Sequence, residues 1–464
     1  MNMSKPNIVL IYPDQMRYDA LSFTGNSVCK TPNIDDLVQE SVNFSESYTS
    51  FPLCCPFRAS LMTGKYAHKT GMLCNHYAIP LNQEFLPNMV KPEGYRSAWI
   101  GKWHLDGGKK FDPVPKEYQL GFDEFVGYSR GHKYLNSVYY RGENPTPYKS
   151  EKFEPVYQTD QLLDFIERAA DDEVPFLGML CYGLPHPPVN DQPDHYKYMY
   201  SPDDITLPPT VPPQCEQRAR EFLAMYYGMV TCVDEQVGRI ISRLKEKDLW
   251  NNTLFILVSD HGDMGFEFGL SDKKLAYRSS AHVPMIIHYP GQAACASVDQ
   301  IVDPSVAVTP TILDYCGVPV PDFMPGKSLK KVMESGADET LDDYAYFQMP
   351  KTSPETDRIL ELLTDQKPFP ERGFRTKDYL YVEKCGAPFQ LFDLKNDPYE
   401  QYNCVDNSKY LDIVRAHRKR LYEIMEKLDD SWDVEMKDFP ETYQRWNEGP
   451  AYYQEVFAKA VYEE

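Results

Sequence analysis

Two stretches, Asn7-Ile-Val-Leu-Ile-Tyr12 and Thr253-Leu-Phe-Ile-Leu-Val-Ser259, decide the fold. Both are apolar, rich in β-branched residues and free of polar alternation, which is typical of strands buried on both faces of a parallel sheet. Asp14 follows soon after the first stretch, and Asp260 follows the second directly. Because ligands of open α/β sheets bind at the carboxyl ends of strands, we expect these two carboxylates to share one crevice.

Further strands and helices alternate along the chain with these two stretches. Apolar runs predict strands at 97–101, 175–184 and 283–289, and helical periodicity predicts helices at 159–170, 219–247 and 408–428. The alternation predicts an α/β domain over residues 1–337, with a large mixed, mostly parallel sheet sandwiched by helices.

The remaining chain has a different pattern. Residues 338–373 carry Pro and charge without a long strand, and we predict a loop or linker with one short helix near residues 357–364. Residues 374–464 predict a smaller α+β subdomain, because strands at 377–382 and 389–394 form a hairpin and one helix follows. The aromatic tail, residues 432–462, is interpreted as a packing flap or an oligomer contact.

Composition excludes several classes of protein. The 464 residues include 48 Lys and Arg and 69 Asp and Glu, a net charge of −21, which argues against a nucleic-acid surface. A few local cations can still bind an anionic substrate. The 11 Cys are too sparse for a disulfide scaffold, and no apolar run approaches the ~18 residues of a spanning helix. With no secretory pattern at the start, we expect a cytoplasmic protein without nucleic-acid or membrane partners.

The sharpest local signal is the segment Cys54-Cys-Pro-Phe-Arg-Ala-Ser-Leu-Met-Thr-Gly64. Pro56 suits the first turn of a helix and Gly64 its C-terminal cap, which puts Cys54 just ahead of a helix N-terminus. Exposed amides and the helix dipole favour an anion there and lower the pKa of a thiol. Arg58 adds a cation on the same side. The alternative for a pair of cysteines alone is two buried, inert side chains.

This segment resembles the hallmark of the type I sulfatases of the alkaline-phosphatase-like superfamily, Cys-x-Pro-x-Arg followed by Thr-Gly. In that family the Cys becomes formylglycine, whose hydrated aldehyde is the nucleophile. The positions of Pro56 and Arg58 select Cys54, rather than Cys55, for this modification. Phe57 departs from the pattern, because the family usually has Ser or Ala there.

Further fragments resemble the family in the right order along most of the chain. The resemblance implies a calcium site that includes position 54 and the residues Asp14, Gln15, Asp260 and His261. It also implies that Arg58, Lys102 and Lys273 hold the negative charge of the sulfuryl group. His186, with Lys273, would protonate the leaving oxygen, and His104 would deprotonate the sulfated hydrate. Asn75 matches a polar residue near the anion.

Each of these residues has an ordinary structural alternative. An Asp after a strand is often a helix cap or a turn residue, and a His in an apolar setting is often a satisfied core side chain. Gln15 is a weak ligand by type, although its amide oxygen can complete an oxygen-rich shell. The resemblance assigns no role to four histidines, which we interpret as structural: His132, His195, His282 and His288.

The resemblance predicts a sulfuric ester hydrolase that acts on a small anionic sulfate ester, such as a sulfated saccharide, after a maturase has converted Cys54. One alternative is a phosphonate monoester or phosphodiester hydrolase of the same superfamily, which Gln15 favours. Lys102 and His104 favour the sulfatase, because the resemblance implies Tyr and Thr at the corresponding positions in the phosphonate branch. Another alternative is a protein that binds sulfated glycans without cleaving them. Residues 106–150 and 345–375 are candidate specificity segments.

Overall fold

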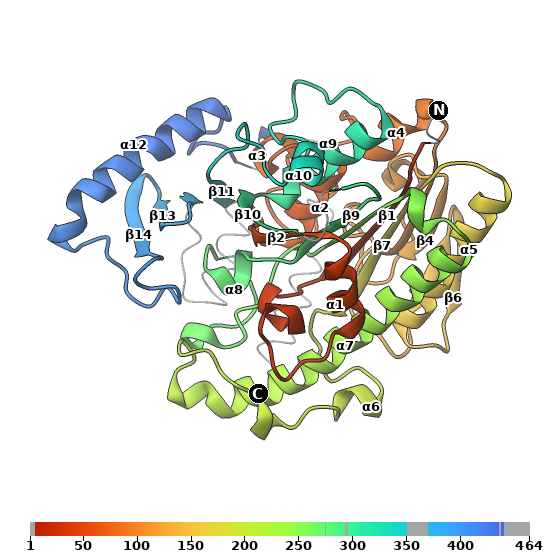
Figure 1. Ribbon diagram of the computed structural model, residues 1–464, viewed down its shortest axis with the longest axis horizontal. Coiled ribbons are helices and arrows are strands. Elements are labelled where there is room, and N and C mark those ends of the chain that lie inside the picture. Colours follow the sequence, from red (N-terminus) through yellow and green to blue (C-terminus); the bar gives the residue numbers. More distant parts are fainter. Residues whose placement is uncertain (1–4, 274, 293–295, 350–369, 436–437, 440–464) are drawn as a thin grey trace.

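A ten-stranded mixed sheet forms the centre of the larger domain in the computed structural model, which describes residues 5–273, 275–292, 296–349, 370–435 and 438–439 (Figure 1). In spatial order its strands are β10 (Ala296–Val302), β2 (Val42–Ser47), β9 (Met285–His288), β8 (Thr253–Val258), β1 (Asn7–Asp14), β7 (Phe176–Pro185), β3 (Arg96–Lys102), β4 (Glu124–Tyr128), β5 (Val138–Arg141) and β6 (Asn144–Lys149). The predicted α/β class, with a mixed, mostly parallel sheet, is confirmed.

The strands around β1 are parallel and fully buried. β1 pairs in parallel with β8 on one side and with β7 on the other, and β7 pairs in parallel with β3. Every residue of β1 and β8 is buried, as expected for strands covered on both faces. Four neighbouring strands, β8, β1, β7 and β3, therefore end at the same edge of the sheet.

Helices cover both faces of this sheet (Figure 1). One face packs against α1 (Pro32–Gln39), α5 (Glu154–Asp171) and α7 (Glu216–Glu246). The other packs against α2 (Cys54–Thr63), α4 (Leu86–Val90), α9 (Pro304–Cys316) and α10 (Lys330–Ser335). Short helices complete this part: α3 (Ala67–Thr70), α6 (Asp194–Lys197) and α8 (Arg278–Ala281). Alternate side chains of β1 point to opposite faces, so Ile8 and Leu10 enter one core while Val9 and Ile11 enter the other.

A second, smaller unit contains an antiparallel sheet in the order β11 (Ala345–Met349), β12 (Glu371–Arg375), β13 (Tyr379–Lys384), β14 (Ala387–Asp393), packed on α12 (Leu411–Lys427). The predicted hairpin corresponds to β13 and β14. The prediction of a loop or linker with one short helix over 338–373 is corrected, because the strand β11 and the start of β12 lie there. β11 has only five residues, which is too short to stand out in the sequence as a long apolar run. Five residues are nevertheless enough for it to pair antiparallel with β12. The helix predicted near 357–364 lies outside the described residues, as does most of the aromatic tail.

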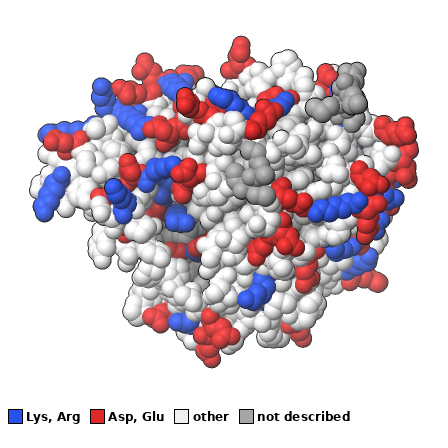
Figure 2. Space-filling model, viewed as in Figure 1, with Lys and Arg blue, Asp and Glu red and all other residues white. Residues whose placement is uncertain are grey.

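Charges of both signs are interspersed over the face in view, without a continuous basic stripe (Figure 2). Within the described ranges, no helix combines the length and the apolar character that a membrane crossing requires.

The buried carboxyl of Glu154, the first residue of α5, makes stability depend on pH. Burial raises its pKa to about 8, although Tyr128 donates a hydrogen bond to it at 3.2 Å. The unfolded chain has a pKa near ~4.3, so the protonated form favours folding. Its contribution is complete below that value and is lost as pH rises through about 8. We expect Glu154→Gln to flatten the wild-type loss of a few kcal/mol between these limits.

Urea unfolding at pH 5.5 and pH 8 measures this effect of Glu154. The wild-type free energy of unfolding should fall more between the two conditions than that of Glu154→Gln. The exposed Glu151→Gln substitution is the control and should keep the wild-type dependence. Parallel losses in wild type and Glu154→Gln would contradict the assignment.

Candidate active site

The four parallel strand ends bring together most of the predicted site residues. Asp14 ends β1, and Asp260 and His261 follow β8, which lies beside it. On the other side of β1, a register shift pairs Asp14 with Pro185, so His186 follows at the end of β7. Lys102 ends β3, the next strand. Residues far apart in sequence therefore meet because their strands are neighbours in the sheet.

Cys54 reaches the same edge as the first residue of α2. The helix begins at Cys54 itself, whereas the sequence predicted a start just after it. It ends at Gly64, whose φ of 69° is the left-handed conformation that glycine adopts most readily. Every residue of α2 is buried, and the side chain of Thr309 donates a hydrogen bond to Leu61 O. The N-terminus of α2 therefore presents position 54 to the strand ends from a well-packed position.

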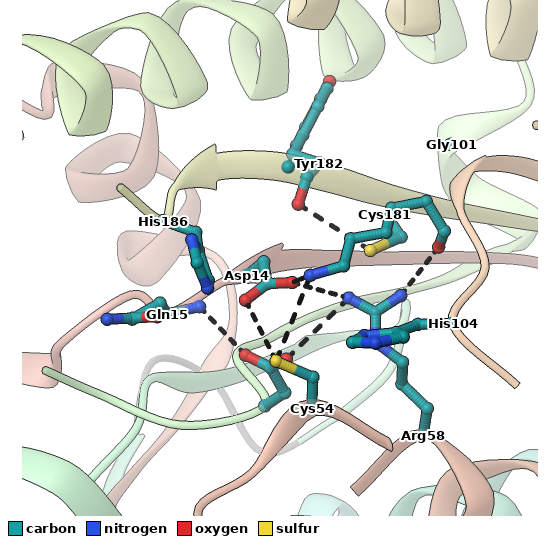
Figure 3. Close-up of polar contacts among 12 residues, drawn as sticks. Asp14, Gln15, Cys54, Arg58, Gly101, His104, Cys181, Tyr182 and His186 are labelled. Carbon is teal, nitrogen blue, oxygen red and sulfur yellow. Dashed lines mark hydrogen bonds and ion pairs between the residues drawn. The ribbon is translucent and has the colours of Figure 1, made fainter. Parts of the chain in front are cut away.

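The thiol of Cys54 lies among both carboxylates and cations (Figure 3). Its Sγ is 3.2 Å from His261 Nε2, 3.7 Å from Asp14 Oδ1 and 4.0 Å from Lys102 Nζ. Burial and Asp14 raise the pKa of the thiol, but Lys102, Lys273 and His261 outweigh them and leave it below its usual value. The surroundings of position 54 therefore favour negative charge.

Asp14 joins the two inner cations. Its Oδ2 accepts from Lys102 Nζ at 2.6 Å and from Arg58 Nη2 at 2.8 Å. Burial alone would raise the pKa of Asp14, yet Lys102 and its other positive neighbours hold the pKa well below the ordinary value. Arg58 also donates to Lys102 O at 2.6 Å, which fixes α2 against the end of β3. Together with Lys273, these residues place three positive charges opposite the two carboxylates, Asp14 and Asp260. The net positive charge of the five side chains favours binding of an anion.

The donor set at position 54 fits a metal ion. Ligand atoms of Asp14, Cys54, Asp260 and His261, all buried, lie within 4.8 Å of one another. Asp260 Oδ2 is buried and accepts no hydrogen bond among the described residues, although Arg58 Nη2 lies 3.9 Å and His261 Nε2 3.5 Å away. A bound cation would supply the missing close partner. His261 Nδ1 lies 3.0 Å from Gly262 O and donates to it, which leaves Nε2 as the ligand nitrogen. The predicted residues thus supply a compact cation site.

Gln15 lies at the edge of this cluster. Its backbone amide donates to Asp260 Oδ1 at 2.9 Å, and its side-chain oxygen accepts from Lys273 Nζ at 2.5 Å. Its side-chain nitrogen donates to Asp263, a buried carboxylate that the sequence analysis did not single out. The structure therefore places Gln15 beside the cluster, where its side-chain oxygen accepts a hydrogen bond from the Lys273 ammonium.

Lys273 and His186 form a hydrogen-bonded pair. The two nitrogens, Lys273 Nζ and His186 Nε2, are 2.8 Å apart, and His186 Nδ1 lies 2.6 Å from Pro187 O. Because the carbonyl only accepts, Nδ1 donates to it and Nε2 accepts from Lys273. Burial and the neighbouring Lys273 hold the pKa of His186 well below its usual value. The pair therefore carries its proton on Lys273, next to a neutral imidazole.

His104 contacts a histidine that the sequence analysis did not mention. His104 Nε2 is 2.9 Å from His76 Nδ1, while its own Nδ1 is buried without a partner in the described part of the chain. Burial and Lys102 lower the pKa of His104 well below its ordinary value, which keeps the imidazole in the form that accepts a proton. Asn75 accepts from the backbone amide of Cys55 at 2.9 Å and so contacts the first turn of α2.

One histidine interpreted as structural lies in the site. The ring of His132 stacks on that of His186, with centroids 3.7 Å apart, and its Nε2 is 3.3 Å from Lys102 Nζ. The other three remain outside: His282 stacks on Tyr18, His288 stacks on Trp250, and His195 packs on its neighbour Tyr196. The only signal in the sequence was that His132 falls within the candidate specificity segment 106–150.

Comparison with known proteins agrees with this geometry. The Sulfatase family profile matches residues 6–318, and that of the C-terminal region of N-sulphoglucosamine sulphohydrolase matches residues 266–427. An ulvan-active sulfatase from Formosa agariphila is 33% identical over 92% of this chain and 83% of its own length. The crystal structure of a yidJ sulfatase from Bacteroides fragilis has a TM-score of 0.84 at 27% identity, covering 93% of this chain and 98% of that one.

A phosphonate monoester hydrolase from Silicibacter pomeroyi shares the fold alone. It is 21% identical to this chain and has a TM-score of 0.79, covering 92% of this chain and 96% of its own.

The site combines a buried thiol, an adjoining cation site and positive side chains at the strand ends, and this combination suits a hydrolase of anionic esters. The chain belongs to the sulfatase family of the alkaline-phosphatase-like superfamily and is a sulfuric ester hydrolase.

Proposed function

We propose that this sulfatase cleaves a sulfate monoester of a small saccharide, with formylglycine generated from Cys54 and with calcium at the adjoining site. The observation that carries the proposal is the convergence of Cys54, two carboxylates and His261 within 4.8 Å. The Cys-x-Pro-x-Arg register supports Cys54 as the residue that a maturase oxidises. The aldehyde hydrate at this position would supply one hydroxyl for attack and a second whose deprotonation releases sulfate.

The residues of this chain then have separable roles. Arg58 and Lys102 hold the charge that develops on the sulfuryl oxygens. His186 and Lys273 together protonate the departing oxygen, with the Lys273 ammonium as the source of the proton and His186, 2.8 Å from it, holding that ammonium in place. His104, kept neutral by its surroundings, is the base that deprotonates the hydrate.

Calcium is the ion we propose because the resemblance implies it and carboxylate oxygens suit it. Asp14 and Asp260 would hold it, with His261 and the group at position 54 completing the set. A divalent cation there would polarise a sulfuryl oxygen and neutralise Asp260. The imidazole of His261 suits calcium less well than an oxygen ligand would. Metal analysis of protein purified without chelators tests this assignment.

A saccharide is proposed because the relative from Formosa agariphila is named for activity on ulvan. A cleft beside the C-terminal subdomain offers room for such a substrate. It has a volume of about 260 Å³ and includes Arg17, Phe268, Arg278 and Tyr399 in its lining. Figure 2 shows a recess on this face next to the subdomain. We further propose that the protein is cytoplasmic and acts on imported saccharides, and its recovery in a periplasmic fraction would contradict this.

Among the described residues that line this cleft, Arg278 is the cation whose side chain forms no ion pair with a carboxylate. Asp19 and Glu267 are paired with Arg17, and Glu400 with Arg375. We expect Arg278→Met to raise KM roughly tenfold for a sulfated saccharide with a second anionic group, the effect of one charge-assisted hydrogen bond of about 1.5 kcal/mol. KM for a small aryl sulfate should stay unchanged.

Initial-rate kinetics on both substrates measure this difference. The exposed Arg415→Met substitution on α12 removes a cation far from the cleft and should leave both KM values unchanged. An equal rise in KM for both substrates after Arg278→Met would show that the cleft does not select the saccharide.

Mass spectrometry of the peptide containing position 54, from protein made in its own host, tests the proposed function. It should show an aldehyde in place of the thiol, and a panel of sulfated saccharides should identify one that releases sulfate. An intact thiol without sulfate release would favour the alternative of a silent glycan-binding protein. A higher rate on an aryl phosphonate than on the matched aryl sulfate would favour the phosphonate hydrolase.

A further inference from the structure

His132 occupies a place between two of the proposed active-site residues. It follows β4 on the loop that returns toward β5, and its ring lies parallel to that of His186, with 6° between the planes. Its Nε2 faces Lys102 Nζ at 3.3 Å, and its Nδ1 lies 2.9 Å from the hydroxyl of Tyr134. No other residue contacts both Lys102 and His186 in this way within the described chain.

The hydrogen bonds of Tyr134 determine which nitrogen of His132 carries the proton. The Tyr134 hydroxyl lies 2.6 Å from His186 O and 3.0 Å from Gly183 O, and both carbonyls only accept. The single hydroxyl proton is therefore donated to the carbonyls, and the oxygen must accept from His132. It follows that Nδ1–H of His132 donates to Tyr134, and that the unprotonated Nε2 accepts from Lys102.

This arrangement directs the ammonium of Lys102. An ammonium has three N–H donors. Asp14 Oδ2 accepts one at 2.6 Å and His132 Nε2 accepts another at 3.3 Å. The remaining donor faces Cys54 Sγ, 4.0 Å away, which is the side where the sulfuryl group is transferred in the proposed function.

We propose that His132 is a positioning residue: its neutral imidazole orients Lys102 toward the sulfuryl group and supports the ring of His186 by stacking. The proposal rests on the proposed function for the role of Lys102, but the hydrogen-bond chain stands without it. The chain runs from the backbone that carries His186 through Tyr134 and His132 to Lys102. A change in any member reaches both the charge-binding cation and the proton donor.

Two substitutions separate the two contacts of His132. His132→Phe keeps a flat ring over His186 and removes the acceptor for Lys102, whereas His132→Gln keeps an acceptor and removes the ring. We expect His132→Phe to lower kcat about 10- to 100-fold with little change in KM, by the same factor for aryl and alkyl sulfates. His132→Gln should retain most of kcat on an aryl sulfate and lose more on an alkyl sulfate, whose leaving oxygen needs the proton.

A double substitution distinguishes positioning from general packing. Tyr134→Phe removes the group that orients His132, so its effect on kcat should not add to that of His132→Phe. Additive losses, or wild-type kcat in His132→Phe, would overturn the proposal. Thermal unfolding of each variant identifies a loss that comes from misfolding, in which case the soluble His132→Gln variant decides through its leaving-group dependence.

A spectroscopic measurement tests the geometry without any turnover. In protein labelled with ¹⁵N-histidine, NMR should show His132 as the neutral tautomer protonated on Nδ1, and Tyr134→Phe should shift this signal. A tautomer protonated on Nε2 overturns the proposal. If wild type released sulfate from no ester but showed the expected tautomer, the proposed function would fail while the hydrogen-bond chain held.

Discussion

Cys54→Ser is expected to abolish turnover, because serine offers one hydroxyl where the proposed aldehyde hydrate offers two. Attack by serine would transfer the sulfuryl group to its oxygen, and no second hydroxyl would remain to expel sulfate. The loss in kcat should be on the order of 10⁶-fold, as for removal of other catalytic nucleophiles. A burst of at most one equivalent of the released alcohol, followed by no further release, is the expected time course.

Cys55→Ser is the matched control for this substitution. Cys55 is also buried, but its thiol donates to the backbone oxygen of His104, and burial raises its pKa. The Cys55→Ser protein should keep both the proposed aldehyde at position 54 and most of the activity. If Cys55→Ser eliminated turnover and Cys54→Ser did not, the choice between the two thiols would be reversed.

Asp260→Asn is expected to weaken binding of the proposed metal ion and, with it, to remove most of the activity. The substitution neutralises the buried Oδ2, which accepts no hydrogen bond among the described residues, so the main electrostatic reason for binding a cation there is lost. We expect metal affinity to fall by more than about 100-fold, since even outer partners of a metal site contribute 10- to 100-fold. Loss of several kcal/mol of charge stabilisation predicts a fall in kcat/KM of about a thousandfold.

Calorimetric titration of the metal-free protein with calcium measures this loss. Asp234→Asn is the control, because Asp234 is a buried carboxylate outside the cluster that accepts from the amide of Ile34 at the start of α1. It should lower the melting temperature and leave calcium affinity unchanged. An Asp260→Asn protein that binds calcium as tightly as wild type would show that the ion is held elsewhere.

The central strands and their polar ends were predictable from sequence. Fully apolar runs identified β1 and β8, and the rule that ligands bind at carboxyl ends placed Asp14 and Asp260 together. The outer strands lacked such a signal. β6, Asn144–Lys149, is exposed along its whole length and contains two prolines, which a strand tolerates only at the edge of a sheet.

The site was less predictable where it depends on contacts between loops. His132 has no motif around it, and only the folded chain shows that the loop after β4 brings it against His186. His76 likewise becomes recognisable through its contact with His104. Spacing along the chain cannot reveal such pairs, because the loops that carry them meet only after the strands of the sheet have assembled.

The burial of α2 determines whether the modification of Cys54 can follow folding. Cys54 is only 1% exposed, and the helix that begins with it is packed on all sides. A second enzyme cannot reach that sulfur once the chain has collapsed around it. The oxidation that we propose for Cys54 would therefore precede folding, and a maturase added to the folded protein should act only on molecules that have first been unfolded.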